Sequence, residues 1–364
     1  MTITTVADVL ARLDRSALTA VAPLAVSIGP VRLRLRCVGA LCAELAAYFA
    51  DVLSEDAPDA IEIDILEGQS LDPAPDWADW AREPGKTGRK DAIHDLRDGR
   101  LIFKRRTGVT FVQSRDAQVA FGPVGANANQ VINFINTQVL NACLRDGWQI
   151  CHAAAVTNGA RTLAIAGLSG GGKSTSVLRM MDLPGTAFVT NDRLMVRGGA
   201  PVPTALGIPK HPRINPGTIL HNTRLHPLLT PARLAELAAM PPDDLWHLEE
   251  KHDLIVPEIY GAGRLRISAP LTDFWVLNWQ RDSAQPTAIS DVTLADRPDL
   301  LGAIMKSAGP FYADASGRFQ TDQTPLACEG YLAALRNVRV SEVTGRIDFD
   351  ALFDKGRRLL GAPA

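Results

Sequence analysis

The residues with the clearest chemical meaning lie at positions 167–175, which read Gly-Leu-Ser-Gly-Gly-Gly-Lys-Ser-Thr. They satisfy the phosphate-loop pattern G-x-x-x-x-G-K-S/T, in which glycines let backbone N–H groups converge on phosphate oxygens. In this pattern Lys173 reaches the β- and γ-phosphates, and the Ser174 hydroxyl ligates Mg²⁺. The stretch therefore predicts a site for a nucleoside triphosphate with Mg²⁺. The residues expected to bind it are Gly167, Ser169, Gly170, Gly171, Gly172, Lys173, Ser174 and Thr175.

The flanks of this loop predict a strand before it and a helix after it. Residues 162–166 are typical of a short buried strand, and residues 177, 178 and 181 are apolar at helical spacing. A helix N-terminus at the loop would add positive partial charge to the phosphate site. Upstream, residues 148–156 read as a strand, and Asn158-Gly159 is a strong hairpin signal. Parallel neighbours cannot be joined by so short a turn. The pattern thus indicates a core other than the ordinary parallel P-loop sheet.

A polar pair follows the next predicted strand, residues 187–189. Asp192 stands where a carboxylate can reach the metal or its water, and we assign it a metal or base role. Asn191 can hydrogen-bond but cannot take a proton, so its expected role is to orient. Asn-Asp at a strand end is also a common turn pair, which is the alternative interpretation.

Three other residues are candidates for contacts with the transferring phosphate. Lys210 and Arg213 lie in a proline-rich stretch that restrains the backbone, and their charges suit an anion. The alternative is a basic surface loop. His152 lies on the predicted strand before the hairpin turn, where a lone histidine is often only a hydrogen-bonded core residue.

Three segments carry a resemblance to a known family: residues 151–156 (Cys-His-Ala-Ala-Ala-Val), the loop at 167–175, and residues 188–193 (Phe-Val-Thr-Asn-Asp-Arg). Together they resemble the catalytic half of HPr kinase/phosphorylase and its relatives, the HPr-kinase-related kinases, over roughly residues 148–218. The resemblance implies a P-loop core with a mixed sheet, shared with phosphoenolpyruvate carboxykinase. It also places His152 close to the phosphates. The family has paired aspartates where this chain has Asn191 and Asp192.

The chain departs from the bifunctional enzyme in a second place. Residues 202–208 keep only Leu-Gly of its signature and lack the acidic residue before it, whereas residues 209–218 resemble the related-kinase branch. The resemblance therefore implies an ATP-dependent kinase without phosphorylase activity, using ATP and Mg²⁺. The acceptor would be a hydroxyl of a small molecule or a Ser/Thr of a partner protein. The alternative is a nucleotide-binding regulatory protein with reduced catalysis. A carboxykinase is a weaker third choice, because 364 residues is short for that family.

Length and periodicity predict two parts, since 364 residues suit about two domains. We expect a mixed α/β chain with a smaller α+β module at 1–126 and an HPr-kinase-like P-loop kinase domain at 127–364. Within them, we expect a strand at 31–36, a helix at 40–53, an antiparallel meander over 101–121 and a helix at 127–144. Residues 245–253 read as a solvated helix face.

Composition limits the partners and the compartment. The 38 basic and 40 acidic residues give a formal charge of −2, which argues against nucleic acid as a partner. Without an apolar run of about 18 residues or a signal pattern, we expect no membrane association and a cytoplasmic protein. Five cysteines without paired spacing favour reduced thiols: Cys37, Cys42, Cys143, Cys151 and Cys328. The family forms oligomers, which makes a homo-oligomer compatible with the resemblance.

Overall fold

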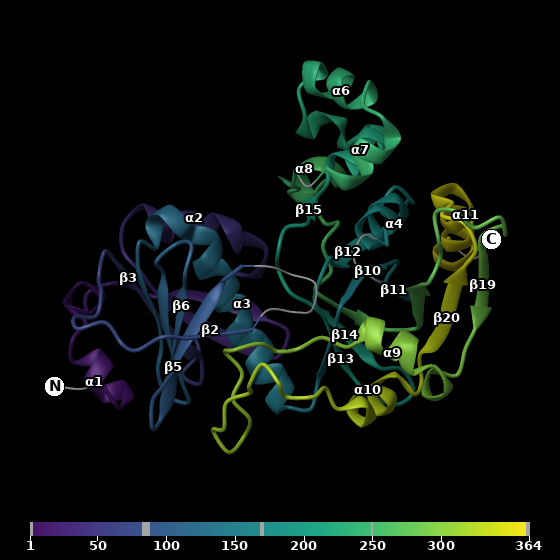
Figure 1. Ribbon diagram of the computed structural model, residues 1–364. Helices are drawn as coiled ribbons and strands as arrows, with labels where there is room; N and C mark the ends of the chain where they lie inside the picture. The colour runs from purple at the N-terminus through teal and green to yellow at the C-terminus, as the bar shows by residue number, and fades with distance from the viewer. Residues whose placement is uncertain (1–2, 82–87, 168–170, 249, 362–364) are drawn as a thin grey trace. The chain divides into compact units, whose positions relative to one another are not determined.

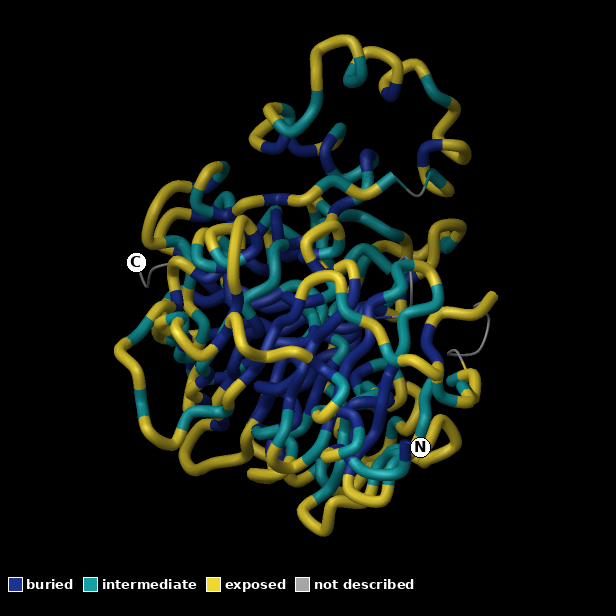
Figure 2. Tube along the Cα trace, turned by 90° about the vertical axis from the view of Figure 1, so that its left-hand side faces the viewer, coloured by how far each residue is buried: buried dark blue, intermediate teal, exposed yellow. Residues whose placement is uncertain are grey.

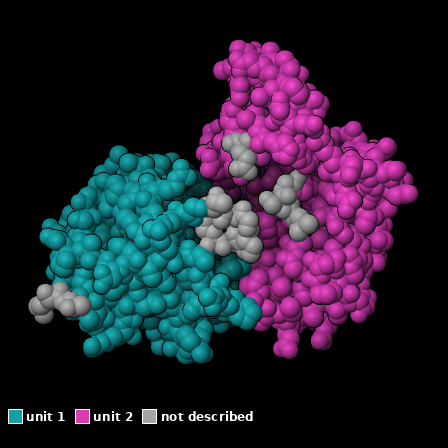
Figure 3. Space-filling model, in the orientation of Figure 1, with its two compact units in different colours: residues 1–146, 307–325 teal, residues 147–306, 326–364 magenta. Residues whose placement is uncertain are grey.

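A computed structural model describes residues 3–81, 88–167, 171–248 and 250–361. The fold is mixed α/β, and its two largest sheets combine parallel and antiparallel strand pairs. Contacts divide the chain into two compact units, Met1–Asp146 with Ser307–Pro325, and Gly147–Lys306 with Leu326–Ala364 (Figure 3). The division into domains at 1–126 and 127–364 concerns independently folding parts and stays a prediction. The limits of the compact units differ from the limits of the predicted domains. Unit 1 extends to Asp146 and also includes residues 307–325.

Unit 1 is built on an eight-stranded sheet with the order β1-β2-β3-β8-β7-β6-β5-β4. The pairs β2–β3 and β3–β8 are parallel, and the others are antiparallel. The alternation of β2 buries Val31, Leu33 and Leu35 and leaves the intervening arginines at the surface or half-buried. The strands are β1 Leu24–Ile28, β2 Val31–Arg36, β3 Ile61–Glu67, β4 Ala78–Asp79, β5 Asp91–Asp95, β6 Gly99–Lys104, β7 Thr110–Ser114 and β8 Gln118–Gly122.

Three helices and a returning segment complete unit 1. The helices are α1 Val6–Leu10, α2 Ala40–Tyr48 and α3 Ala128–Arg145, and α3 packs against α2, β2 and β3 (Figure 1). The helix expected at 40–53 ends earlier, at Tyr48, and a 3₁₀ turn follows at Ala50–Val52. Arg100, only 2% exposed, donates to the carbonyl oxygens of Pro310 (3.2 Å) and Gln320 (2.8 Å). These bonds attach the segment Ser307–Pro325 to unit 1.

The expectation of reduced thiols is wrong for two of the five cysteines. Cys37 and Cys42 form a disulfide with their Cα atoms 5.5 Å apart. Cys37 follows β2 and Cys42 lies in the first turn of α2, so the short connection between strand and helix brings both sulfur atoms within bonding reach. Sequence spacing alone does not show this, because the pairing depends on where the helix begins. Cys143, Cys151 and Cys328 take no part in a disulfide.

Unit 2 contains three sheets. The largest has the order β12-β10-β11-β18-β20-β19, with parallel pairs β11–β18 and β18–β20; the smaller ones are β17-β14-β13-β9 and β15-β16. The strands are β9 Gln149–Cys151, β10 Ala153–Thr157, β11 Thr162–Gly167, β12 Ala187–Thr190, β13 Leu194–Arg197, β14 Thr204–Gly207, β15 Arg213–Ile214, β16 His252–Asp253, β17 Ser268–Pro270, β18 Asp273–Leu277, β19 Ala288–Asp291 and β20 Arg339–Thr344.

The hairpin expected before the loop is confirmed. β10 and β11 pair antiparallel, from Ala153 opposite Ala166 to Thr157 opposite Thr162. The side-chain oxygen of Asn158 accepts the N–H of Arg161 at 2.7 Å across the turn. The single strand expected at 148–156 is wrong, however. It breaks at His152, so that β9 joins the four-stranded sheet and β10 joins the six-stranded sheet.

Two cores lie on opposite faces of the six-stranded sheet. Alternate residues of β11 belong to different cores. Ala164 and Ala166 pack in a cluster with helix α9, Pro298–Ile304. Leu163 and Ile165 pack in a second cluster with residues of the helices α4 and α11. Helices α4 (Lys173–Met180) and α11 (Phe349–Leu360) contact each other. Every residue of β10, β11, β12 and β18 is buried, and buried residues are dark blue in Figure 2. Helix α10, Cys328–Leu335, contributes to the first core.

Residues 216–260 form a group of short helices (Figure 1): α5 Pro216–Leu220, α6 Pro231–Ala238, α7 Pro242–His247 and α8 Val256–Tyr260. The helix face expected at 245–253 is wrong beyond His247, where α7 ends. His252–Asp253 instead forms β16, because it pairs with β15. Throughout the described ranges, we find no helix that combines the length and the apolar character needed to span a bilayer.

Candidate functional site

The glycine- and lysine-containing segment joins the end of β11 to the start of α4. Gly172 has φ +87°, a left-handed conformation that favours glycine, and Lys173 is the first residue of α4. The Lys173 ammonium donates to the carbonyl oxygen of Gly167 at 3.1 Å, so it folds back over the loop. Ser169 and Gly170 of the expected set lie outside the described residues. The described part has the strand–loop–helix order that the sequence predicts.

Aromatic side chains hold the described part of this loop in place. The Trp279 indole N–H donates to the Gly171 carbonyl oxygen at 2.9 Å. A Cβ atom on Gly172 would lie 2.7 Å from ring atoms of Phe349, which begins α11. The Trp279 and Phe349 rings are 5.2 Å apart and nearly perpendicular. Glycine at position 172 is therefore required both by its backbone conformation and by the ring against it.

This packing gives a prediction for stability. Gly172→Ala should lower the free energy of unfolding by about 1–3 kcal/mol more than Gly159→Ala, in the range typical of overpacking. Both glycines have positive φ, but Gly159 has nothing within 4 Å of an added Cβ, so it controls for backbone strain alone. Urea unfolding of the two variants measures the difference. Equal destabilisation would show that Phe349 does not constrain the loop.

The hydroxyl groups at the start of α4 differ in the hydrogen bonds that they make within the protein. The Thr175 hydroxyl is 2.7 Å from that of Thr218, and the Ser176 hydroxyl donates to the Gly172 carbonyl oxygen at 2.9 Å. Ser174 is half-buried, and its hydroxyl has no hydrogen bond to another described residue. Ser174 is thus the hydroxyl available to a ligand, whereas Thr175 and Ser176 stabilise the protein.

Asp192 is the centre of the charged groups near the loop. Its Oδ1 lies 3.3 Å from His152 Nε2 and 4.0 Å from Lys306 Nζ, and its Oδ2 lies 3.7 Å from Arg193 Nε. Burial opposes ionisation of this carboxyl. The hydrogen bond from His152 and the charges of Lys306 and Arg193 outweigh that effect, and they hold the pKa of Asp192 well below its usual range. Asp192 is a carboxylate at every pH at which the folded protein is expected to work.

Lys173 belongs to the same group of charges. Burial lowers the pKa of Lys173, Asp192 acts to raise it, and the neighbouring Lys306 acts to lower it further. Among the described residues, Asp192 therefore has the cations Arg193 and Lys306 close to it and Lys173 within electrostatic reach. The excess positive charge makes the site suitable for an anion.

Lys306 was not found by the sequence reasoning, and only the fold brings it here. It follows α9, where the Ile304 carbonyl oxygen accepts the His152 N–H at 2.7 Å. The Tyr331 hydroxyl accepts the Lys306 N–H at 3.3 Å and donates to the Ile150 carbonyl oxygen at 2.8 Å. Residues 304–306 are thus fixed beside residues 150–152. No motif surrounds Lys306, so no signal in the sequence could have identified it.

The other expected residues lie as follows. Asn191 Oδ1 is buried and has no hydrogen-bond partner among the described residues. Arg213 is about half exposed in β15, with its Nε 3.0 Å from Asp253 Oδ1. Lys210 is half-buried between β14 and β15. The structure brings His152 to Asp192 and shows Arg213 engaged with another carboxylate, and the clamp by Lys210 and Arg213 stays a prediction.

The oxygen donors suit a metal ion that arrives with phosphate. In the part of the chain that the structure describes, no three His, Cys, Asp or Glu side chains group closely enough to hold a metal by themselves. Mg²⁺ typically takes one or two carboxylates, with phosphate oxygens and waters as the remaining ligands. The Asp192 carboxylate, the Ser174 hydroxyl and the unpartnered Asn191 Oδ1 fit this requirement. They would hold Mg²⁺ only together with a nucleotide.

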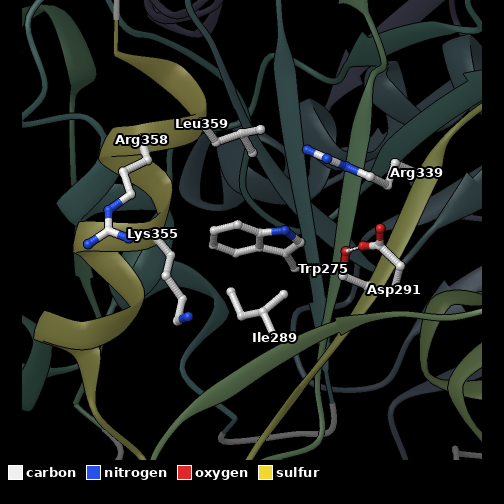
Figure 4. Close-up of a pocket in the computed structure, with 8 residues that line it drawn as sticks. Trp275, Ile289, Asp291, Arg339, Lys355, Arg358 and Leu359 are labelled. Atoms are coloured by element: carbon white, nitrogen blue, oxygen red, sulfur yellow. Dashed lines mark hydrogen bonds between the residues drawn. The ribbon is translucent and has the colours of Figure 1, made fainter.

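A cavity of about 310 Å³ lies elsewhere in unit 2 (Figure 4). The sticks in Figure 4 show Trp275 between α11 and the strands β19 and β20. Its lining residues are Trp275, Ile289, Asp291, Arg339, Ser341, Lys355, Arg358 and Leu359. None of the expected site residues is among them. The cavity is therefore separate from the charges around Asp192.

Comparisons with known proteins add little to what the geometry of the site indicates about function. No protein-family model matches the chain, and no curated protein matches it in sequence. Among solved structures, the chain is similar to the HPr(Ser) kinase/phosphatase of Coxiella burnetii, with 13% identity and a TM-score of 0.29 over 58% of this chain and 97% of that one. At these values the similarity says nothing about activity. The interpretation of the site therefore rests on its own residues.

Proposed function

We propose that the protein is an ATP-dependent kinase that transfers the γ-phosphoryl group to a hydroxyl. The observation that carries the proposal is the meeting of Lys173, at the first turn of α4, with the ionised Asp192 and its cations. Phosphoryl transfer needs charge neutralisation, in-line positioning and a group that orients the acceptor hydroxyl. Cations and a carboxylate in one partly buried site supply these needs.

The reaction is a substitution at phosphorus. The bond from the γ-phosphorus to the bridging oxygen breaks, a bond to the acceptor oxygen forms, and ADP leaves with the electron pair. Lys173 and the amino end of α4 bind the phosphates. Asp192 accepts a hydrogen bond from the acceptor hydroxyl and takes its proton late in the transfer, because its low pKa makes it a weak base. Mg²⁺, when bound with the nucleotide, supplies further neutralisation of the phosphate charge.

We propose the chemical class of the phosphoryl acceptor, which is a hydroxyl group. A hydroxyl of a small molecule, or a Ser or Thr of a partner protein, would satisfy the chemistry at Asp192. A homo-oligomer is compatible with the family resemblance. Labelled ATP added to a metabolite mixture and to a proteome, with and without the protein, tests both acceptor classes. The proposal requires that the protein consumes ATP and that one of the two mixtures gains label.

A second candidate function is nucleotide-dependent regulation without catalysis. The observation that favours it is Asn191, which stands where the resembled family has a second carboxylate and whose side-chain oxygen is buried without a partner in the described chain. Such a protein would bind Mg²⁺·ATP and release it unchanged. Measured ATP turnover separates the candidates, because binding without turnover in the presence of every acceptor fraction supports regulation.

We expect no appreciable phosphorylase activity. Phosphorylase activity requires inorganic phosphate to attack the phosphoryl group of the phosphorylated acceptor, so that pyrophosphate forms, and it requires the leaving hydroxyl to be protonated. Asp192 is held in its ionised form and Asn191 cannot donate an acidic proton. Incubating phosphorylated acceptor with phosphate and Mg²⁺ should therefore leave it intact. Formation of pyrophosphate by the wild type would contradict this prediction, and Asn191→Asp tests whether a second acid allows phosphorolysis.

A further inference from the structure

We propose that Lys306 is a second phosphate-binding residue of this site and that its ammonium contacts the γ-phosphoryl group during transfer. The inference rests on the proposed kinase function and adds a catalytic residue to it. The sequence predicts that Lys210 and Arg213 together clamp the transferring phosphate. The fold instead delivers Lys306 to the carboxylate that receives the acceptor.

Burial of the side chain and hydrogen bonds to the backbone restrain the position of Lys306. Its side chain is only 17% exposed, and its ammonium lies 4.0 Å from the Asp192 oxygen that also faces His152. Its backbone is held by the Tyr331 hydroxyl, which also binds the Ile150 carbonyl oxygen. A mostly buried stem on a fixed backbone loses little further freedom when a ligand binds, so the charge is preorganised.

The charge balance argues for an anion beside Lys306. Among the described residues, Lys306 and Arg193 lie near Asp192, and Lys173 lies within electrostatic reach of both Asp192 and Lys306. A phosphate bound among these cations would reduce the repulsion between them. The separation of 4.0 Å is also at the outer limit of an ion pair. Lys306 can therefore contact a phosphate while it remains near Asp192.

The neighbours of Lys306 indicate which phosphate it contacts. Lys173 belongs to the loop that holds the nucleotide, and Asp192 belongs to the acceptor side of the transfer in the proposed reaction. Because Lys306 adjoins Asp192, its charge lies at the γ-phosphoryl group rather than at the phosphates that stay with ADP. Its contribution is expected mainly where charge develops during transfer.

The test compares Lys306→Gln with wild type in two binding titrations and one rate measurement. Calorimetry with Mg²⁺ and a non-hydrolysable ATP analogue should show affinity reduced about tenfold to a hundredfold, as for a lost hydrogen bond to a charged group. The affinity for ADP should change little. Turnover should fall about 10²- to 10³-fold, as when a donor to a developing oxyanion is removed. Lys306→Arg, which keeps the charge, should retain the preference for the triphosphate.

Lys355→Gln is the matched control. It removes the same charge from a half-buried lysine on α11 that lines the separate cavity (Figure 4). Both titrations and the rate should match wild type. A loss as large as that of Lys306→Gln would mean that overall charge, and not Lys306, controls binding.

The outcomes separate the two proposals. If wild type binds neither nucleotide, the kinase proposal fails. If wild type binds and turns over ATP but Lys306→Gln keeps the same preference and rate, Lys306 does not contact the γ-phosphoryl group and this inference is overturned. If Lys306→Gln does not fold, wild type is acetylated at its lysines and mapped by mass spectrometry. The ATP analogue, but not ADP, should then protect Lys306, and equal labelling in both would overturn the inference.

Discussion

Lys173→Ala should abolish turnover and weaken Mg²⁺·ATP binding by at least about a hundredfold. Hydrogen bonds to charged groups contribute about 1.5–3 kcal/mol each, and about 1.4 kcal/mol corresponds to tenfold in affinity. A lysine that binds two phosphates therefore accounts for such a loss. Within the described residues, its partly buried ammonium donates a hydrogen bond to the Gly167 carbonyl oxygen. The cost to folding should accordingly be small.

Calorimetry measures the affinity, and circular dichroism checks the fold. Lys355→Ala is the control for charge, since Lys355 lies on α11 and lines the separate cavity. Unchanged nucleotide affinity in a folded Lys173→Ala variant would mean that the loop does not bind phosphate. The kinase proposal would then lose its first requirement.

Asp192→Asn should reduce turnover by two or more orders of magnitude, in line with the roughly 10²- to 10⁴-fold effect of a general base. Asparagine has nearly the same shape but cannot accept the hydroxyl proton, and it leaves Lys306 and Arg193 without their counter-charge. Triphosphate binding should weaken much less than turnover, because removing a negative charge does not repel phosphate, and phosphate oxygens and water remain as ligands of Mg²⁺. Steady-state rates with an identified acceptor, together with calorimetry on the same sample, separate the two effects.

The pH dependence provides a further check on the same residue. The pKa of Asp192 is held well below its ordinary value of about 3.9, so this carboxylate contributes no titration step at neutral pH. For stability, a lowered pKa means that the contribution of Asp192 is present above the unfolded-state pKa and is lost as pH falls through the folded-state value. A step in turnover at pH 6–8 that disappears in Asp192→Asn would mean that the pKa of this carboxyl is raised above its ordinary value, which contradicts its assigned environment. Full activity of Asp192→Asn would make it a turn residue.

The sequence was sufficient to predict those parts of the structure that depend on residues adjacent in the chain. The Asn158-Gly159 turn, the strand at 162–166 and a helix after the loop follow from turn chemistry and periodicity, and the structure confirms them, with the helix at Lys173–Met180. A glycine at position 172 is explained by its left-handed backbone. Such features are set by a few adjacent residues, and their patterns repeat in other proteins.

Periodicity misled where two sheets meet. Residues 148–156 have the pattern of one strand, but β9 and β10 pair with different partners and part at His152. The same limit applies at residues 245–253, where pairing of β15 with β16 replaces the expected helix. Cys37 and Cys42 form a disulfide because a helix begins between them. In each case partners distant in the chain decided the local structure.

By itself, the sequence determined the residue types of the site: a phosphate loop with its lysine, one acidic residue after a strand, and a histidine before the hairpin. The tertiary structure alone decided how those charges meet. It placed Lys306 beside Asp192, paired Arg213 with Asp253, and set Trp279 and Phe349 against the loop. The physical reason is that phosphate binding by a loop depends on consecutive backbone N–H groups, whereas the balance of charge around a carboxylate depends on side chains from separate strands and helices.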